Sequence, residues 1–303
     1  NGAPSLLAAG AGHPDQRLDV FLAARLACSR ADARHVIEAG GVLLNGRPAR
    51  SGHRVHAGDR VEVTNLISDA SVDPHSFEAS ARDQLAISEA DLIVENGGGY
   101  DPFVDTLLTA AGSTAPVITA VDVSGLDGAG EEGFNEHVWY SFAATEKVVG
   151  VVADQLGQLD PDHADEYTAN ADALGSAIAE LLARAEGLGV TGDVAVTEPV
   201  PGYLLQAAGL TNVTPADFTE AIEEGNDVPP LALQETLALF SAKKVLLLAY
   251  NSQTASPETE RVRQAAEDAG IPVVDFTETL PAGADYVSWM TSNLDALATA
   301  LGR

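Results

Sequence analysis

The chain has 303 residues, enough for two lobes of ordinary size, and its 46% hydrophobic content allows a substantial core. This content argues against a globally disordered chain, and the sequence has no apolar run of the length that a membrane-spanning helix needs. A single cysteine, Cys28, excludes an intrachain disulfide.

The formal net charge of −29 is distributed unevenly along the chain. Residues 1–63 hold eight arginines and no lysine against six acidic residues, a net charge of +2. Residues 64–303 hold the other eight basic residues against 39 acidic ones, a net charge of −31. The larger part repels a polyanion such as RNA and attracts cations. The change in composition near residue 63 indicates a domain boundary.

Residues 1–14 are expected to form a flexible arm, although the stretch 4–12 could instead be the tail of a signal peptide. In residues 15–63, apolar positions at helical spacing predict a helix over 18–26. Ser29 is a suitable N-cap for a second helix, which Gly40 ends. A strand at 42–44 precedes the hairpin turn signal Asn45–Gly46, and another strand is predicted at 60–63. The segment therefore has a small α+β pattern.

The stretches RLDVFLAARL (17–26), SRADARHVIEAGGVLLNGRP (29–48) and AGDRVEV (57–63) resemble the S4 RNA-binding domain that precedes pseudouridine synthases. In such domains, arginines of the second helix and the hairpin contact phosphates, because guanidinium groups suit phosphate oxygens. The resemblance makes these RNA-binding candidates: Arg30, Arg34, Arg47, Arg50 and Arg54. A basic face without a ligand is the favoured alternative, because the rest of the chain is strongly acidic.

Strand and helix patterns alternate through the rest of the chain. Strands are predicted at 61–67, 92–95, 116–121, 194–197, 244–249 and 272–276, and helices at 142–156 and 164–188. The triplet Gly97–Gly99 predicts a turn, because it is too short for a nucleotide-binding loop. A helix over 164–188 would be about 37 Å long, enough to join two lobes. We therefore predict an α/β fold with an N-terminal lobe at 64–163, a rigid linking helix at 164–188 and a C-terminal lobe at 189–303.

Five stretches resemble the metal-binding solute receptors of ABC importers for zinc, manganese and iron. They are SVDPHSFEAS (71–80), ADLIVENGGGYDPFVDTLL (90–108), NEHVWYS (135–141), TEPVPGYLLQAAGL (197–210) and FTETLPAGADYVSWMTSNLDAL (276–297). The resemblance implies two α/β lobes with a metal between them and a monomeric receptor that passes the metal to a membrane permease. It also implies a place in the periplasm or at the cell surface, often as a lipoprotein.

The same resemblance implies four metal ligands, which are His75, His137, Glu198 and Glu278. Glu278 stands where most members carry Asp. Two imidazoles and two carboxylates suit tetrahedral Zn²⁺, whereas bidentate carboxylates would suit Mn²⁺ or Fe²⁺. The loop at 125–134 is acidic and has no histidine, unlike the His-rich loop of many zinc-dedicated members. The cargo is expected to be Mn²⁺ or Zn²⁺, with Fe²⁺ as a further candidate.

Each proposed ligand has a plainer alternative. His75 could be a loop histidine, and His137 could be a buried structural histidine. Glu198 could cap the helix entered at Pro199, and Glu278 could be a surface residue. Three aspartates compete as ligands but are expected to support turns or ligands: Asp73, Asp101 and Asp275. The chain shows no nucleophile paired with a base, so we do not expect an enzyme. The alternatives to a receptor are an RNA-binding protein that acts through the S4-like segment, or an adhesin with the receptor fold.

The strand and helix that open the receptor family's first lobe are not recognisable, and the S4-like segment occupies their place. This segment is either a natural fusion or a chimera. Without the opening strand, the sheet of the first lobe would have an exposed edge and an uncovered face. We therefore expect that lobe to be the less stable of the two.

Overall fold

The computed structural model describes residues 16–18, 43–44, 47–48, 54–55, 65–67 and 77–303, apart from residues 130, 132 and 282. The contacts divide the chain into two compact units, Asn1–Ser68 and Asp69–Arg303. No helix within the described ranges combines the length and the apolar character needed to span a bilayer.

The first unit contains two short antiparallel strand pairs. Strand β1 (Gln16–Arg17) pairs with β4 (Arg54–Val55), and β2 (Leu43–Leu44) pairs with β3 (Arg47–Pro48). Leu44 lies opposite Arg47, so the strands on either side of Asn45–Gly46 pair as the predicted hairpin requires, while the two turn residues lie outside the described residues. The two predicted helices lie outside the described residues, apart from a single helical position at Leu18.

The N-terminal part of the second unit has a parallel pair of strands with helices around it. Strands β5 (Ile93–Glu95) and β6 (Val117–Thr119) pair in register, with Val94 opposite Ile118. The helices are α3 (Ala81–Glu89), α4 (Phe103–Ala111) and α5 (Ala120–Ser124). The strand predicted at 116–121 is therefore shorter than expected, because helix α5 begins at Ala120.

The prediction of a strand over 61–67 is wrong at residues 65–67, which the structure describes as irregular. The physical reason is Asn65, a residue type that is depleted in strands and favours turns. The preceding part of that prediction, at 61–64, lies outside the described residues.

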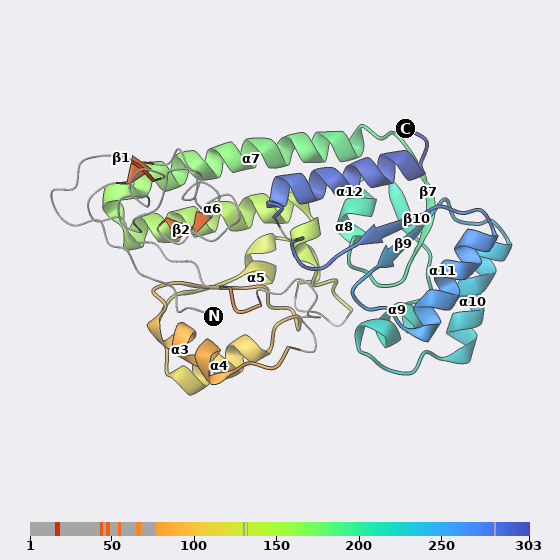
Figure 1. Cartoon of the computed structure of the whole chain (residues 1–303), viewed down its shortest axis with the longest axis horizontal. Coiled ribbons are helices and arrows are strands. Elements are labelled where there is room, and N and C mark those ends of the chain that lie inside the picture. The colour runs from red at the N-terminus through yellow and green to blue at the C-terminus, as the bar shows by residue number, and fades with distance from the viewer. Residues whose placement is uncertain are drawn as a thin grey trace, which may run out of the picture. The chain divides into compact units, whose positions relative to one another are not determined.

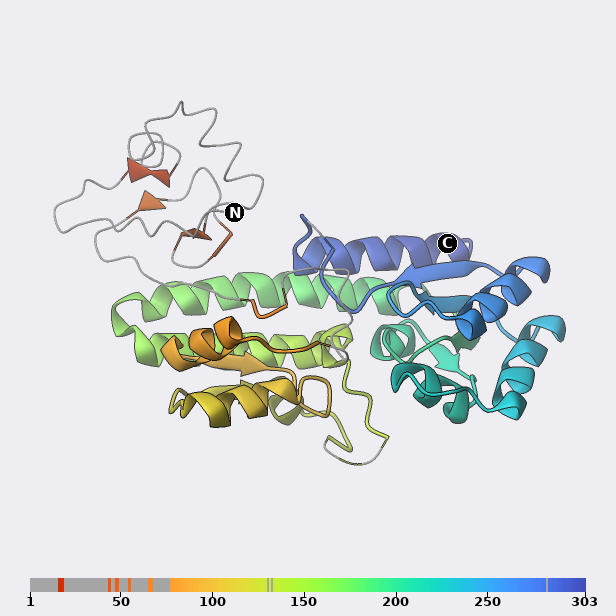
Figure 2. The same cartoon turned by 60° about the horizontal axis from the view of Figure 1, so that its bottom comes forward.

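Two long helices follow, and they lie side by side in both views (Figure 1 and Figure 2). The 3-10 turn η2 (Val138–Tyr140) leads into α6 (Phe142–Leu159), whose N-cap Ser141 accepts a hydrogen bond from the backbone N–H of Ala144 at 3.3 Å. A second 3-10 turn, η3 (Pro161–His163), leads into α7 (Ala164–Glu186). Helix α7 has 23 residues and is about 35 Å long.

The C-terminal part contains a four-stranded parallel sheet in the order β10-β9-β7-β8 (Figure 1). Its strands are β7 (Gly192–Val196), β8 (Leu210–Asn212), β9 (Leu248–Asn251) and β10 (Val273–Phe276). Its helices are α8 (Gly202–Ala207), α9 (Ala216–Glu223), α10 (Pro230–Ser241), α11 (Pro257–Asp268) and α12 (Tyr286–Ala300). A parallel sheet with helices between its strands confirms the predicted α/β class.

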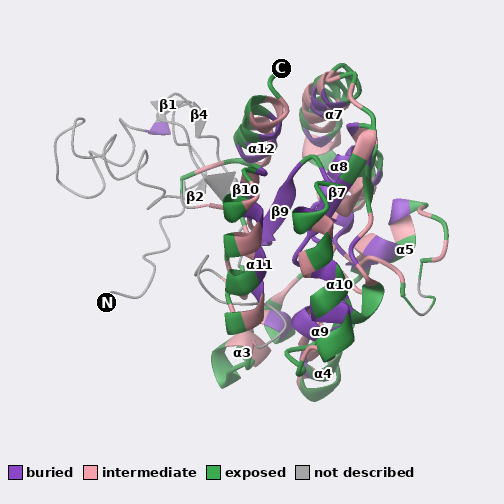
Figure 3. Ribbon diagram, turned by 90° about the vertical axis from the view of Figure 1, so that its right-hand side faces the viewer, coloured by how far each residue is buried: buried purple, intermediate pink, exposed green. Residues whose placement is uncertain are grey.

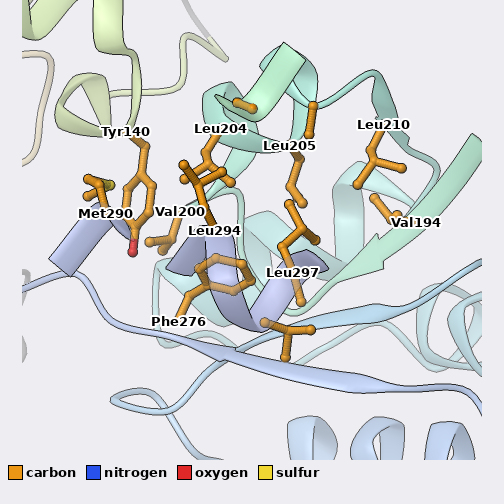
Figure 4. Close-up of a cluster of buried hydrophobic side chains, with 14 of the residues drawn as sticks. Tyr140, Val194, Val200, Leu204, Leu205, Leu210, Phe276, Met290, Leu294 and Leu297 are labelled. Carbon is orange, nitrogen blue, oxygen red and sulfur yellow. The ribbon is translucent and has the colours of Figure 1, made fainter. Parts of the chain in front are cut away.

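Both faces of this sheet are covered, as is usual for parallel strands. Alternate residues of a strand point to opposite faces, so Val194 of β7 joins one core cluster while its neighbour Ala195 joins the other. Helices α7, α8 and α12 cover the first face, α8 with Leu204 and α12 with Leu294 among the residues that Figure 4 labels. Helices α9, α10 and α11 cover the second face. Strand β9 is buried along its whole length (Figure 3).

Candidate metal centre

Two of the predicted ligands lie at the carboxyl edge of the C-terminal sheet. Glu198 follows β7 and Glu278 follows β10, and in parallel sheets the carboxyl ends of the strands meet at one edge, where ligands commonly bind. Both side chains are buried, with 2% of Glu198 and 4% of Glu278 exposed. Burying carboxylates is costly unless hydrogen bonds or a cation compensate them. The edge of the sheet therefore carries two acidic groups of the kind that a cation would stabilise.

Asn251 lies between these two carboxylates, at the end of the intervening strand β9. Its side-chain Nδ2 donates to Oε2 of Glu198 and to Oε1 of Glu278, the latter at 2.6 Å. The hydroxyl of Thr254 also donates to Oε2 of Glu198. One buried amide thus holds both predicted carboxylate ligands at a common point.

The loop that carries Glu278 is also fixed through its backbone. Oε1 of Gln253 accepts hydrogen bonds from the backbone N–H groups of Glu278, at 2.5 Å, and Thr279, at 3.2 Å. On the other side, the hydroxyl of Tyr140 donates to the carbonyl oxygen of Thr277 at 2.7 Å. Burial raises the pKa of Tyr140 well above its usual range, so it remains a hydrogen-bond donor. The position of Glu278 is therefore set from both ends of its loop.

His137 comes from the loop before η2 and is 1% exposed. Oδ1 of Asn135 lies 2.8 Å from Nδ1 of His137 and accepts from its backbone N–H at 3.1 Å. An amide oxygen only accepts, so Nδ1 carries the proton and Nε2 carries the lone pair that would bind a metal. Asn135 is itself held, because its Nδ2 donates to the carbonyl oxygen of Pro199 and its own carbonyl accepts from Tyr203. This support links the His137 loop to the residue that follows Glu198.

Tyr100 contacts a predicted ligand of each lobe. Its hydroxyl lies 3.4 Å from Oε2 of Glu278, and its ring meets the ring of His137 edge-on with 5.8 Å between centroids. The preceding residues Gly97–Gly99 all have positive φ, which confirms the predicted turn. Both carboxylate oxygens of Asp101 accept backbone hydrogen bonds, from Asn96 and Gly97 at 2.7 Å each. The expectation that Asp101 supports a turn is confirmed.

Two further glutamates lie close to His137. Among the residues that the structure describes, the three whose ligand atoms lie within 4.8 Å of one another are Glu136, His137 and Glu223. Oε1 of Glu223 lies 3.8 Å from Nδ1 of His137. Burial, and then repulsion from Glu136, Glu198 and Glu278, raises the pKa of Glu223 to about 8. His137 is thus grouped more tightly with these two glutamates than with the two predicted carboxylates.

The plainer alternatives for the predicted carboxylates do not match the structure. The N-cap of α8 is Pro201 rather than Glu198, and no side chain caps it. Glu278 is buried rather than on the surface. Asp275 is exposed and pairs with Arg263 at 3.0 Å. These observations leave Glu198 and Glu278 as the carboxylates that face each other across Asn251.

The structure does not describe the side chains of the remaining candidates. His75 and Asp73 lie outside the described residues, as do Arg30, Arg34 and Arg50. Arg47 and Arg54 lie in strands β3 and β4, but only their backbone is described. The predicted phosphate contacts of the S4-like segment therefore stay predictions.

Sequence reasoning did not find the residues that surround the predicted ligands: Tyr100, Asn135, Glu136, Glu223 and Asn251. A glutamate on a helix of a very acidic chain carries no local signal of burial. Asn251 could have been found from its place after the apolar run at 245–250, because parallel strands end where ligands bind.

Comparisons with known proteins match both parts of the chain to protein families. The family model described as Zinc-uptake complex component A periplasmic matches residues 53–300, and the S4 domain model matches residues 16–61. Manganese-binding lipoprotein MntA of Halalkalibacterium halodurans is 31% identical over 117 residues, which cover 39% of this chain and 39% of MntA. Zinc-binding lipoprotein AdcA of Streptococcus pneumoniae is 28% identical over 266 residues, which cover 80% of this chain and 52% of AdcA. The chain thus spans about half of these curated relatives or less.

Among solved structures, the solute-binding protein FpvC of Pseudomonas aeruginosa in complex with Ni²⁺ is similar, with a TM-score of 0.66 and 28% identity. The match covers 81% of this chain and 90% of FpvC. Its extent supports the predicted fold class over most of the chain.

Proposed function

Because the chain belongs to the family of periplasmic zinc-uptake receptors, we propose that it captures one divalent transition metal ion outside the cytoplasm and delivers it to an ABC importer. The family consists of solute receptors rather than enzymes. The finer parts of the proposal are a Mn²⁺ or Zn²⁺ cargo, a monomeric receptor, and a membrane permease as docking partner. The names of MntA and AdcA, a manganese-binding and a zinc-binding lipoprotein, support this choice of cargo.

The observation that carries the proposal is the pair of buried carboxylates at one edge of the C-terminal sheet. Glu198 and Glu278 share the donor Asn251. Tyr100 of the N-terminal lobe contacts Glu278 and also the ring of His137, which lies in its own lobe. A divalent cation compensates two buried negative charges, and Nε2 of His137 adds a nitrogen ligand. The proposed ligand set is His137, Glu198 and Glu278, together with His75 as the family resemblance implies.

Native mass spectrometry of protein dialysed against Mn²⁺ or Zn²⁺ tests this function. We expect one metal ion per chain, and no bound metal in the variant Glu198→Ala/Glu278→Ala. The matched control is Glu267→Ala/Asp275→Ala, which removes two exposed carboxylates that pair with Arg263 in the same lobe. The control should keep its metal. A metal that stays on the first variant, or leaves both variants equally, would overturn the ligand assignment.

A further inference from the structure

Asn251 has a geometry that restricts the two carboxylates it contacts. The residue is 2% exposed, and the two hydrogens of its Nδ2 go to Oε2 of Glu198 and Oε1 of Glu278. Its Oδ1 accepts from the backbone N–H of Gln253 at 3.0 Å, and its own backbone N–H donates to Oγ1 of Thr197 at 2.8 Å. Because the oxygen and the nitrogen of the amide each have their own partners, the side chain cannot turn over without losing hydrogen bonds.

On this basis, and given the proposed function, we propose that Asn251 is a positioning residue that limits each carboxylate to one metal-coordinating oxygen and thereby favours Zn²⁺ over Mn²⁺. A carboxylate is bidentate when both of its oxygens turn to the metal. Oε2 of Glu198 accepts from two donors, Asn251 and Thr254, and Oε1 of Glu278 accepts from Asn251. Oε2 of Glu278 lies 3.4 Å from the Tyr100 hydroxyl, a longer contact than the 2.6 Å between Oε1 and Asn251. The oxygen that Asn251 holds is thus directed at the protein in each carboxylate, and the second oxygen is the one that would turn to a metal.

Single-oxygen coordination decides which ion fits. One oxygen from each glutamate and one nitrogen from His137 give three protein ligands, and one more donor completes the tetrahedron that Zn²⁺ adopts. Mn²⁺ prefers six oxygen-rich ligands, which bidentate carboxylates would help to supply. Nitrogen and oxygen sites in general bind Zn²⁺ more tightly than Mn²⁺, and Asn251 adds to that preference.

The test combines the visible spectrum of the Co²⁺ complex with competition measurements of Zn²⁺ and Mn²⁺ affinity. Four-coordinate Co²⁺ absorbs visible light far more strongly than six-coordinate Co²⁺, so we expect an intense spectrum for the unaltered chain. Asn251→Ala should weaken that spectrum and lower the ratio of the Mn²⁺ to the Zn²⁺ dissociation constant about tenfold, the lower end of the effect of residues that support metal ligands. Asn212→Ala, at the end of β8 in the same sheet, should change neither quantity.

Two further results separate the possible failures. Thr254→Val removes the second donor to Oε2 of Glu198 and should shift the ratio in the same direction, even if Asn251→Ala does not fold. A weak, six-coordinate Co²⁺ spectrum of the unaltered chain would overturn the inference without any variant. An unchanged ratio in folded Asn251→Ala would overturn it while leaving metal capture intact. If Zn²⁺, Mn²⁺ and Co²⁺ all fail to bind the unaltered chain, the proposed function fails as well.

Discussion

The turn that presents Tyr100 gives a sharp prediction through Gly97→Ala. Gly97 has φ +74°, and a Cβ atom there would lie 2.3 Å from Cγ2 of Thr119. Thr119 cannot rotate away without loss, because its hydroxyl donates to Oε1 of Glu95 at 2.7 Å. The substitution therefore forces either strand β6 or the turn to move.

Two costs add in this variant. A residue with a Cβ atom in the left-handed region costs about 1–2 kcal/mol, and overpacking a filled site costs about 1–3 kcal/mol. We expect Gly97→Ala to lower the free energy of unfolding by about 2–5 kcal/mol. The matched control is Gly112→Ala, which has φ +61° and no atom within 4 Å of the added Cβ, so it should show only the first cost.

Urea unfolding of both variants, followed by circular dichroism, measures the difference. Metal affinity should also fall in Gly97→Ala, because the turn carries the tyrosine that contacts Glu278 and His137. If the two glycine variants lose equal stability, the packing of the turn against Thr119 is not as described, and the reasoning is refuted.

Three other predictions concern the site and the N-terminal sheet. In chelated protein, burial and neighbouring carboxylates raise the pKa of Glu223 from 4.5 to about 8, so stability present at low pH should be lost as pH rises through about 8. Glu223→Gln should flatten this profile in thermal melts, and an unchanged profile would contradict the burial of a protonated acid. Tyr100→Phe should weaken metal binding about fivefold, because it removes a long hydrogen bond to a charged group that contributes about 1 kcal/mol. In a Glu278→Gln background the same substitution should leave metal binding unchanged. Amide exchange should be faster at 93–95 than at 248–251, because Val94 is 51% exposed whereas all of β9 is buried; equal protection would argue against a weaker first sheet.

Much of the C-terminal lobe could be predicted from the sequence, because its strands are short apolar runs between amphipathic helices. The strand predicted at 272–276 is found at Val273–Phe276. The strand predicted at 244–249 is found at Leu248–Asn251 instead. The prediction ended too early because Asn251 is polar, and its burial depends on carboxylates that are distant in the sequence.

The candidate site was predictable only in part. The ligand residues came from motifs, whereas their supports depend on tertiary contacts that no local pattern records. Glu223 lies on α9, far from any motif, and its proximity to His137 appears only in the fold. Glu136 stands beside His137 in the sequence, but one acidic residue among 45 gives no sign of its role.

Metal capture by the second unit is most directly tested by thermal melts of the chelated protein with added Mn²⁺, Zn²⁺, Fe²⁺ or Mg²⁺, alongside His137→Ala. A ligand that binds only the folded state stabilises it by about 2.7 kcal/mol at a hundredfold excess over Kd. We predict a melting temperature that rises with the concentration of a transition metal, no comparable rise with Mg²⁺, and the loss of this rise in His137→Ala. A melting temperature that no transition metal changes, or that rises equally in the variant, would contradict metal capture at this site.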